Sequence, residues 1–290
     1  MKICPTCGGQ FEANDFCCPA CGHSPELRDG YPTFAPELAA GYNGFKTDFF
    51  ASLAELEVGN FWFESRNRLL TWALDRYFPN MESFLEVGCG TGFVLSGIRR
   101  EFRDIALFGS DIFTEGFAYA KERVPEATFF QMDACNIPYK NEFDVIGAFD
   151  VIEHIEEDEI VLSQILRAVK SGGGIILTVP QHLWLWSKGD EIACHKRRYS
   201  KKELAAKVEN AGFHILRLTS FVSFLLPLMA VSRLRYRLGV SDQKESGSEL
   251  RQPPLLNALL KGVLGIERSL IRNGASFPVG GSLLCVGVKV

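Results

Sequence analysis

Short apolar runs alternate with helix-like segments along the middle of the chain. Five runs have the length and the β-branched and aromatic content of buried strands, and they lie at 84–87, 105–110, 127–132, 143–150 and 175–180. Residues 92–100, between the first two runs, follow the spacing of a helix. Strands that alternate with helices form parallel sheets covered on both sides, so the pattern predicts an α/β fold with helices on both faces.

Two later runs, at 213–218 and 282–290, bring the expected sheet to seven strands. A glycine-rich turn is expected at 171–174, just before the fifth strand. Helical spacing also appears at 65–78, ahead of the first strand, where the helix would cover the ligand site, and at 201–211. More than 60 residues separate the sixth and seventh strands, so the chain predicts a helical insertion at about 219–275.

The insertion begins with an uncharged apolar segment, 219–232, which Pro227 interrupts and which Arg233, Arg235 and Arg237 follow. A polar stretch at 241–254 is expected to be mobile. An amphipathic helix is expected at 255–271. Two interpretations stay open: a lid that packs on the domain, or an interfacial element that admits a lipid-like acceptor with its arginines at headgroups.

The N-terminal residues contain two copies of one pattern, Cys-Pro-x-Cys-Gly. Each copy is a tight turn that points two thiolates at one centre, and four thiolates suit Zn²⁺. The predicted ligands are Cys4, Cys7, Cys18 and Cys21. A redox Cys-x-x-Cys is the rival interpretation, but two such pairs outside a βαβ context favour metal. The sequence therefore predicts a structural zinc ribbon at 1–25, a linker at 26–40 and the main domain at 41–290.

Composition narrows the setting of the protein. The 290 residues carry a net charge of −4, so no global attraction draws the chain to nucleic acid. No secretory apolar region opens the chain and no uncharged run is long enough to span a bilayer. Nine cysteines, of which four are assigned to metal, fit a reducing compartment. The expected location is the cytoplasm, with peripheral contact to the inner face of the membrane if the interfacial interpretation holds.

The first strand is followed by the chain's most informative motif, Glu86-x-Gly88-x-Gly90-x-Gly92. Glycines after a strand let backbone approach a ligand, and the following helix start offers unpaired N–H groups. A dinucleotide site needs a small residue where Phe93 stands, so that cofactor is disfavoured. The motif resembles motif I of the class I S-adenosylmethionine (SAM)-dependent methyltransferases.

This resemblance implies a Rossmann-like seven-stranded sheet and a SAM site at the carboxyl ends of its first strands. Asp111 closes the second run, where a carboxylate accepts hydrogen bonds from ribose hydroxyls. Asp133 follows the third run, where the family places an acid near the adenine amino group. The residues expected at the cofactor are Glu86, Gly88, Gly90, Gly92, Asp111, Ile112, Asp133, Ala134 and Phe149.

Three further blocks resemble a bacterial subgroup of the type 11/12 methyltransferases, and these lie at 61–66, 184–200 and 278–284. The resemblance covers essentially everything after the ribbon. Asn60 and Gly189 stand where the subgroup often has histidine, so this chain does without those two imidazoles. Members of the subgroup are often associated with glycan or lipid-linked sugar pathways.

Acceptor-side chemistry is expected on the loops after the fourth and fifth strands. His195 is the first candidate for general base because imidazole titrates near neutral pH, and Asp190 accompanies it. Trp184 and Trp186 belong to the same loop, while Arg197 and Arg198 could hold a phosphate or carboxylate on the acceptor. The plain alternative is a solvated basic turn.

Asp150-x-x-Glu153-His154 is similar to the divalent-metal site of ubiquinone-type O-methyltransferases, since acid, acid and imidazole can bind a metal. The alternative is a helix start beside the cofactor.

The function expected from the sequence is O-methylation of a small-molecule, glycan or lipid-linked acceptor. A ribosomal-RNA methyltransferase that uses the ribbon for RNA recognition is the alternative. The acidic balance and the few basic residues of the ribbon argue against nucleic acid. A binding module that retains only the cofactor fold is a third possibility, and it would be recognised by a failure to bind SAM.

Overall fold

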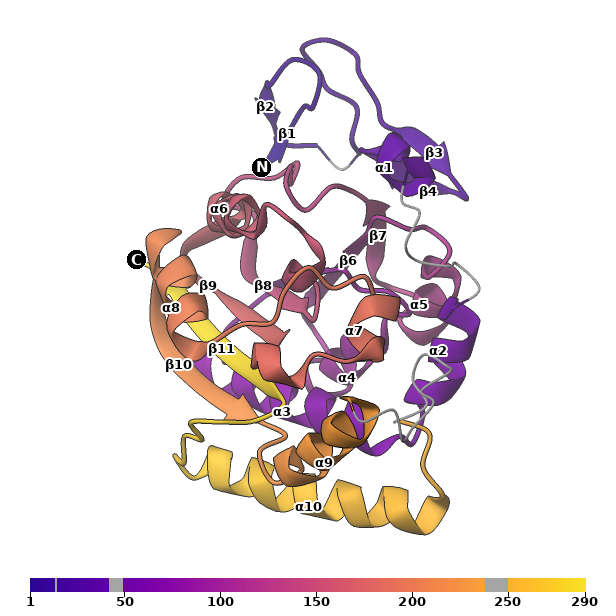
Figure 1. Ribbon diagram of the computed structural model, residues 1–290. Helices are drawn as coiled ribbons and strands as arrows, with labels where there is room; N and C mark the ends of the chain where they lie inside the picture. The colour runs from indigo at the N-terminus through magenta and orange to yellow at the C-terminus, as the bar shows by residue number, and fades with distance from the viewer. Residues whose placement is uncertain (14, 42–48, 238–249) are drawn as a thin grey trace.

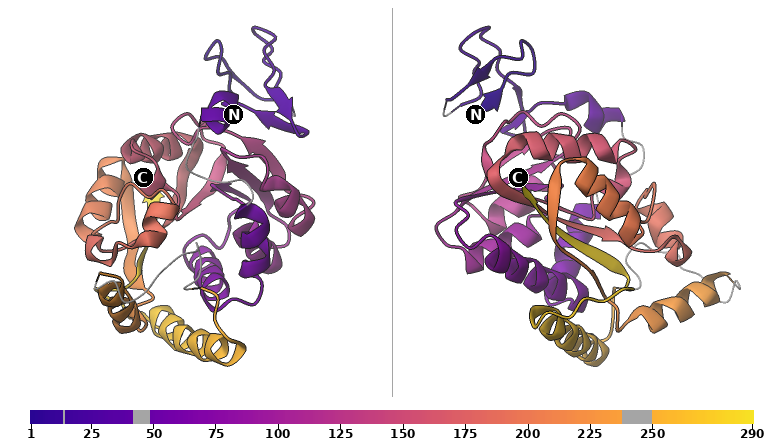
Figure 2. Two further views of the ribbon diagram at one scale, coloured as in Figure 1. Left: turned by 45° about the vertical axis from the view of Figure 1, so that its right-hand side comes forward. Right: turned by 90° about the vertical axis from the view of Figure 1, so that its left-hand side faces the viewer.

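The computed structural model describes residues 1–13, 15–41, 49–237 and 250–290. A nine-stranded sheet forms the centre, with the strand order β10-β11-β9-β8-β5-β6-β7-β4-β3. A separate two-stranded sheet, β1 (Lys2–Ile3) with β2 (Gln10–Phe11), belongs to the N-terminal ribbon. Figures 1 and 2 show this ribbon at one end of the molecule and helix α10 at the opposite end.

The strands and helices of the main domain alternate as the apolar pattern predicts. Its strands are β5 (Ser83–Val87), β6 (Ala106–Asp111), β7 (Thr128–Gln131), β8 (Phe143–Phe149), β9 (Val169–Pro180), β10 (Phe213–Phe221) and β11 (Ser282–Lys289). Its helices include α3 (Phe61–Tyr77), α4 (Phe93–Glu101), α5 (Phe117–Arg123), α6 (Asp158–Ala168) and α8 (Lys201–Asn210).

The directions of the strands indicate where a ligand site is expected. Strands β5 to β9 pair in parallel, whereas β11 pairs antiparallel with both β9 and β10. The chain order reverses beside β5, where β6 lies on one side and β8 on the other. In open parallel sheets ligands bind outside the carboxyl ends of the strands at such a reversal.

Two hydrophobic clusters cover the two faces of the sheet. One contains apolar side chains of α3, α4, α5 and α10, and the other contains those of α6 and α8. Neighbouring residues of β5 alternate between the clusters, with Phe84 in the first and Leu85 in the second, and both are fully buried. Because both faces of such a strand are buried, its sequence is continuously apolar and does not alternate between apolar and polar residues.

Three sequence expectations are wrong: the linker, the number of strands and the turn before the fifth strand. The segment expected as a linker forms β3 (Glu26–Arg28), β4 (Tyr31–Thr33) and α1 (Pro36–Gly41), and the β3–β4 hairpin adds two strands beside β7. The sheet therefore has nine strands instead of seven among the described residues. The turn expected at 171–174 lies inside β9, because β9 continues back to Val169 with an irregular register beside β8.

The insertion between β10 and β11 forms two helices, α9 (Leu226–Arg237) and α10 (Pro254–Arg272). Helix α10 packs along α3 through Leu260, Leu264 and Ile271. The polar stretch expected at 241–254 falls largely outside the described residues. No helix among the described residues is long and apolar enough to cross a membrane.

The N-terminal ribbon packs on the main domain. Ile3 donates its backbone N–H to the carbonyl of Pro138, and Lys140 donates to Met1. Phe16 lies edge-on against Phe34 and Tyr139, with ring centroids 5.0 and 6.2 Å away. These contacts tie the ribbon to the segment after β7, away from the α10 end of the molecule.

Candidate active site

The glycine loop after β5 is held by the acid at the end of β6. Asp111 accepts a hydrogen bond from the backbone N–H of Gly90 at 3.0 Å and another from Phe113 at 3.1 Å. Burial raises the pKa of Asp111 to about 6, in spite of those hydrogen bonds. Asp111 therefore fixes the loop and still presents a carboxylate beside it.

Gly88 lets the loop pass close to the neighbouring strand end. Its φ is +72°, and a Cβ atom there would lie 2.4 Å from Val151. Gly92 caps α4 with a φ of +70°, and a Cβ there would lie 2.8 Å from the backbone of Ala120. Gly92 therefore serves helix packing rather than the ligand surface.

Glu86 is an acid buried among apolar residues at the end of β5. Burial raises its pKa well above the usual range, against the attraction of Arg66. Its Oε2 has no hydrogen-bond partner among the described residues. A buried polar atom without a partner costs free energy, which indicates that a ligand satisfies it.

A cavity of about 560 Å³ lies along these strand ends. Its lining includes these residues expected at the cofactor: Glu86, Gly88, Gly90, Asp111, Ile112, Ala134 and Phe149. Asp133 does not line the cavity, since its carboxylate accepts from the backbone N–H of Cys135 at 2.8 Å. Its neighbours Met132 and Ala134 line the cavity at that point instead.

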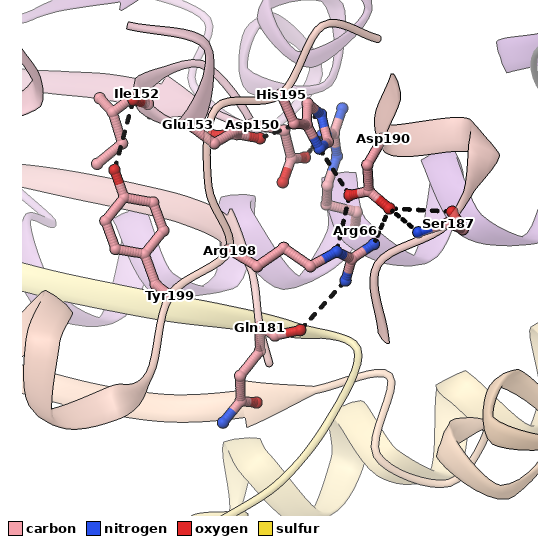
Figure 3. A network of polar contacts seen from close by, with 10 residues as sticks. All are labelled: Arg66, Asp150, Ile152, Glu153, Gln181, Ser187, Asp190, His195, Arg198 and Tyr199. Carbon is pink, nitrogen blue, oxygen red and sulfur yellow. Dashed lines mark hydrogen bonds and ion pairs between the residues drawn. The ribbon is translucent and has the colours of Figure 1, made fainter. Parts of the chain in front are cut away.

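Asp190 is the most heavily bonded acid on the acceptor side of the cavity (Figure 3). Arg198 holds both its oxygens, with Nε at 2.7 Å and Nη2 at 3.0 Å. Ser187 adds its backbone N–H and its hydroxyl. Burial alone would raise the pKa of Asp190, but the hydrogen bonds from His195 and Arg198 hold it well below its usual range. Asp190 is therefore an ionised anchor.

His195 is oriented by this anchor. Its Nδ1 lies 2.8 Å from Oδ1 of Asp190, and because an ionised carboxylate only accepts, Nδ1 carries the proton. Its Nε2 faces Glu153, with 3.9 Å between Nε2 and Oε1. In the neutral ring Nε2 carries the lone pair, and His195 lines the cavity, so this imidazole can serve as a base for a group bound there.

Glu153 is fully buried, and neither of its carboxylate oxygens has a hydrogen-bond partner among the described residues. Burial, reinforced by Asp150, raises its pKa well above the usual range. His154 lies with its ring centroid 4.6 Å from that of His195. Burial and the neighbouring His195 lower the pKa of His154 to about 4, so its ring is neutral at physiological pH.

Glu153, His154 and His195 bring three possible metal-ligand atoms within 4.8 Å of one another. This set differs from the Asp150, Glu153 and His154 expected from the sequence. Asp150 is instead paired with Arg66, whose guanidinium also lies over the ring of Trp62.

Several expected acceptor contacts are wrong. Arg198 is engaged by Asp190, and Arg197 pairs with Asp158 at 3.0 Å, so neither is placed to hold an anionic group of the acceptor. Trp184 and Trp186 do not line the cavity. The solvated basic turn is also an incomplete description, since Arg198 and His195 are largely buried.

The sequence did not indicate two groups at the cavity. On α2 (Phe49–Glu57), Glu57 accepts from the Thr91 hydroxyl at 2.6 Å and from Arg123 at 2.6 Å. On α9, Arg233 lines the cavity and donates to the carbonyl of Leu185 at 2.9 Å. Glu57 and Arg233 could not be predicted at the cavity, because the packing of their helices is not visible in any local sequence pattern. Arg66 also lines the cavity, and its place at the end of the block at 61–66 was a weak indication of that.

Comparison with known proteins agrees with this geometry. Residues 85–177 match the family model described as a methyltransferase domain. The chain is 24% identical to norajmaline N-methyltransferase of Rauvolfia serpentina over 42% of the chain and 44% of that protein. It is 32% identical to phosphatidylethanolamine N-methyltransferase of Cereibacter sphaeroides over 32% of the chain and 48% of that protein. The chain thus spans about half the length of the curated relatives it matches.

A solved structure shares the fold. Phosphoethanolamine N-methyltransferase 2 of Haemonchus contortus, in complex with SAM, has a TM-score of 0.51 at 21% identity, over 77% of this chain and 52% of that one. The matched family segment begins in β5 and ends in β9, so it contains the glycine loop, Asp111 and Glu153. The chain therefore carries a SAM-dependent methyltransferase domain.

Proposed function

We propose that the protein transfers a methyl group from SAM to a hydroxyl group of its acceptor, with His195 as general base. One observation carries the proposal: a single cavity joins the glycine loop and Asp111 to the oriented imidazole of His195. The part of the cavity at the glycine loop and Asp111 suits a nucleoside cofactor. The part at His195 suits removal of a proton from an acceptor. The residues that would hold SAM are Glu86, Gly88, Gly90, Asp111, Ile112 and Phe149.

The residues present fit that cofactor. Glu86 offers a buried oxygen in need of a donor, and the loop has no room for a side chain at Gly88, where a Cβ would lie 2.4 Å from Val151. Bound SAM would supply a methyl group on a sulfonium, which is already activated for displacement. The protein has to align the acceptor, exclude water and take one proton.

His195 performs the proton step. Asp190 holds Nδ1–H, so Nε2 accepts the proton of the acceptor hydroxyl, and the imidazolium that forms is stabilised by the Asp190 carboxylate. Arg198 and Ser187 keep Asp190 in place during this step. The relatives named above act on nitrogen, whose free base needs less help, so the oriented base favours a hydroxyl acceptor here.

The class of acceptor is a small molecule, a glycan or a lipid-linked compound. The lipid-linked class has support from the exposed apolar faces of α9 and α10, since α9 also lines the cavity through Met229 and Arg233. An RNA acceptor would need exposed basic residues near the cavity, and Arg197 is instead paired with Asp158.

We also propose that the ribbon binds one structural zinc ion in a reducing compartment such as the cytoplasm. The Sγ atoms of Cys4 and Cys21 lie 3.6 Å apart, and those of Cys7 and Cys18 lie 3.7 Å apart. Tetrahedral zinc with Zn–S bonds of about 2.3 Å requires sulfur separations of about 3.8 Å. All four thiols lie within 4.8 Å of one another, and four sulfurs leave zinc no open position for catalysis.

Incubation of the protein with cell extract and SAM labelled in its methyl group tests the proposed function. Mass spectrometry should find a labelled product with the methyl group on oxygen, and the Asp111→Ala variant should form much less of it. A label found on nitrogen, or on RNA, would replace the hydroxyl acceptor with another class.

A further inference from the structure

The outer surface of α9 and α10 is unusually apolar. Its exposed large apolar side chains are Leu228, Val231 and Leu234 on α9, and Leu255, Leu256, Leu259, Ile266 and Leu270 on α10. Leu255 is 88% exposed and Leu259 is 63% exposed. Figures 1 and 2 show both helices at the end of the molecule away from the ribbon. Isolated exposed leucines are ordinary, but a patch of this extent marks an interaction surface.

Each helix has an inner and an outer side. On α10, Leu255, Leu259, Ile266 and Leu270 recur at intervals of four and seven, so they share a face that is separate from the core face of Leu260 and Leu264. On α9, the exposed side is formed by Leu228, Val231 and Leu234. Met229 and Arg233, four residues apart, line the cavity from the inner side of α9.

The charges beside this patch are almost all positive. Residues 226–235 and 250–272 contain six basic residues, Arg233, Arg235, Arg251, Lys261, Arg268 and Arg272, and one acid, Glu267. Arg233 is buried on the cavity side and Lys261 pairs with Glu64, so the outer surface carries the positive charges of Arg235, Arg251, Arg268 and Arg272. Glu267 is buried and accepts from the backbone N–H of Phe224 at 2.8 Å, so it adds no charge to the surface. Burial lowers the pKa of Arg268, and the positive charges of Arg68 and Arg272 add to this effect.

We propose that the outer face of α9 and α10 docks on the surface of an anionic lipid bilayer. Leucine side chains would enter the headgroup region while the arginines contact lipid phosphates. A second copy of this chain fits less well, because a symmetric contact would bring the same positive charges together. The whole chain has a net charge of −4, so the positive area is local to this face.

Docking would also place the cavity at the membrane surface. Helix α9 contributes Met229 and Arg233 to the cavity, and Arg233 binds the carbonyl of Leu185 just before the segment that carries Asp190. A lipid-linked acceptor could then reach His195 past α9 without leaving the bilayer. This assignment of the acceptor rests on the proposed function, whereas the docking itself does not.

Vesicle flotation tests the docking. The full chain is mixed with vesicles of phosphatidylcholine alone or of phosphatidylcholine with phosphatidylglycerol, and the floated fraction is measured. We expect flotation with the anionic vesicles only, and loss of flotation as salt is raised. The double variant Leu255→Ser/Leu259→Ser should bind at least roughly tenfold more weakly, since each leucine would lose its burial. Leu27→Ser, a change at a 69% exposed leucine of β3, should bind like the wild type.

Charge and self-association are tested on the same preparations. Arg235→Ala/Arg272→Ala should lose about the affinity of two surface charges, a factor of roughly 10 to 30. Absence of flotation at every lipid composition would overturn the docking. A dimer in sedimentation that Leu255→Ser/Leu259→Ser dissociates would overturn it in favour of contact between copies.

SAM affinity, measured on each preparation by calorimetry, separates the two proposals. If the protein binds vesicles but not SAM, the proposed function is rejected and the proposed docking stands. If it binds SAM but not vesicles, only the docking is rejected.

Discussion

A single carboxylate, that of Asp190, organises the acceptor side of the cavity. It is held by Arg198 and Ser187 and in turn fixes His195. Removing a buried acid of this kind would leave the Arg198 guanidinium without its partner, which costs several kcal/mol. Substitution of His195 therefore tests the proton step better than substitution of Asp190, because the ion pair between Asp190 and Arg198 remains when His195 is removed.

The His195→Ala variant should keep the SAM affinity of the wild type and lose turnover by roughly 10²–10⁴. Steady-state rates with the identified acceptor, alongside calorimetry with SAM, would measure both quantities. His214→Ala is the matched control, because His214 is exposed on β10 and lies outside the cavity. Undiminished turnover in His195→Ala would remove His195 from the chemistry.

The pH dependence of SAM binding should report on Asp111. Its pKa in the free protein is raised to about 6, so the carboxylate is neutral below that pH and ionised above it. Ionised carboxylates accept hydrogen bonds more strongly, so SAM affinity should rise as pH increases through about 6 and level off above. Calorimetry across this range measures the effect. In Asp111→Asn the inflection should vanish, and its persistence would assign it to another acid such as Glu86.

At the level of single residues, the sequence could locate groups whose role depends on their own position in a motif. Glu86 and Asp111 lie at the ends of β5 and β6, and His195 follows closely after Asp190, which lies in the short helix α7 (Lys188–Ile192). The sequence could not determine how the arginines after His195 are used, because Arg198 reaches Asp190 only after the chain folds back. Asp133 lies after β7, where the family has an acid, but its side chain accepts a hydrogen bond from the backbone of its own turn, at Cys135.

The loop between β5 and α4 offers a test at the scale of an element. Gly88 and Gly59 have nearly the same φ, +72° and +73°, but only Gly88 has a close neighbour where a Cβ would stand. Gly59→Ala should cost about 1–2 kcal/mol of unfolding free energy from backbone strain alone. Gly88→Ala should cost about 1–3 kcal/mol more through overpacking, and should also weaken SAM binding.

Chemical denaturation without SAM, followed by SAM titration, would measure both quantities for the two glycine variants. Equal losses of unfolding free energy would mean that Val151 moves aside easily.

Elements with long apolar runs were predictable, and short exposed ones were not. The seven main strands lie within a few residues of their expected positions, except that β9 begins earlier, because burial on both faces leaves a continuous apolar signal. The β3–β4 hairpin gave no such signal, since all three residues of β3 are exposed and β4 contains Pro32. Its place in the sheet comes from pairing with β7, a contact distant in sequence.

The molecule as a whole has the cysteine ribbon at one end and helices α9 and α10 at the other (Figure 2), and these two helices carry the exposed apolar side chains. Because the ribbon packs on the segment after β7 through Phe16 and Tyr139, it stabilises the outer part of the sheet and lies away from α9. This position fits a structural zinc better than a role in the chemistry.

Elemental analysis of the purified chain should find about one zinc ion per molecule. Cys18→Ser should lose the metal, because Cys18 is one of the four clustered thiols. Cys17→Ser is the matched control and should retain it, since the exposed neighbouring thiol is not in the cluster. Iron in place of zinc, or equal loss in both variants, would contradict the assigned ligands.

The central claim is that the strand ends around the glycine loop bind SAM, and calorimetric titration of SAM into the full chain tests it most directly. We predict one site per chain. Asp111→Ala should weaken binding by roughly 10- to 150-fold, because hydrogen bonds to a charged group contribute about 1.5–3 kcal/mol. Asp104→Ala, a change at an exposed acid just before the same strand, should leave the affinity unchanged. No binding of SAM, or equal affinity in the wild type and Asp111→Ala, would contradict the account.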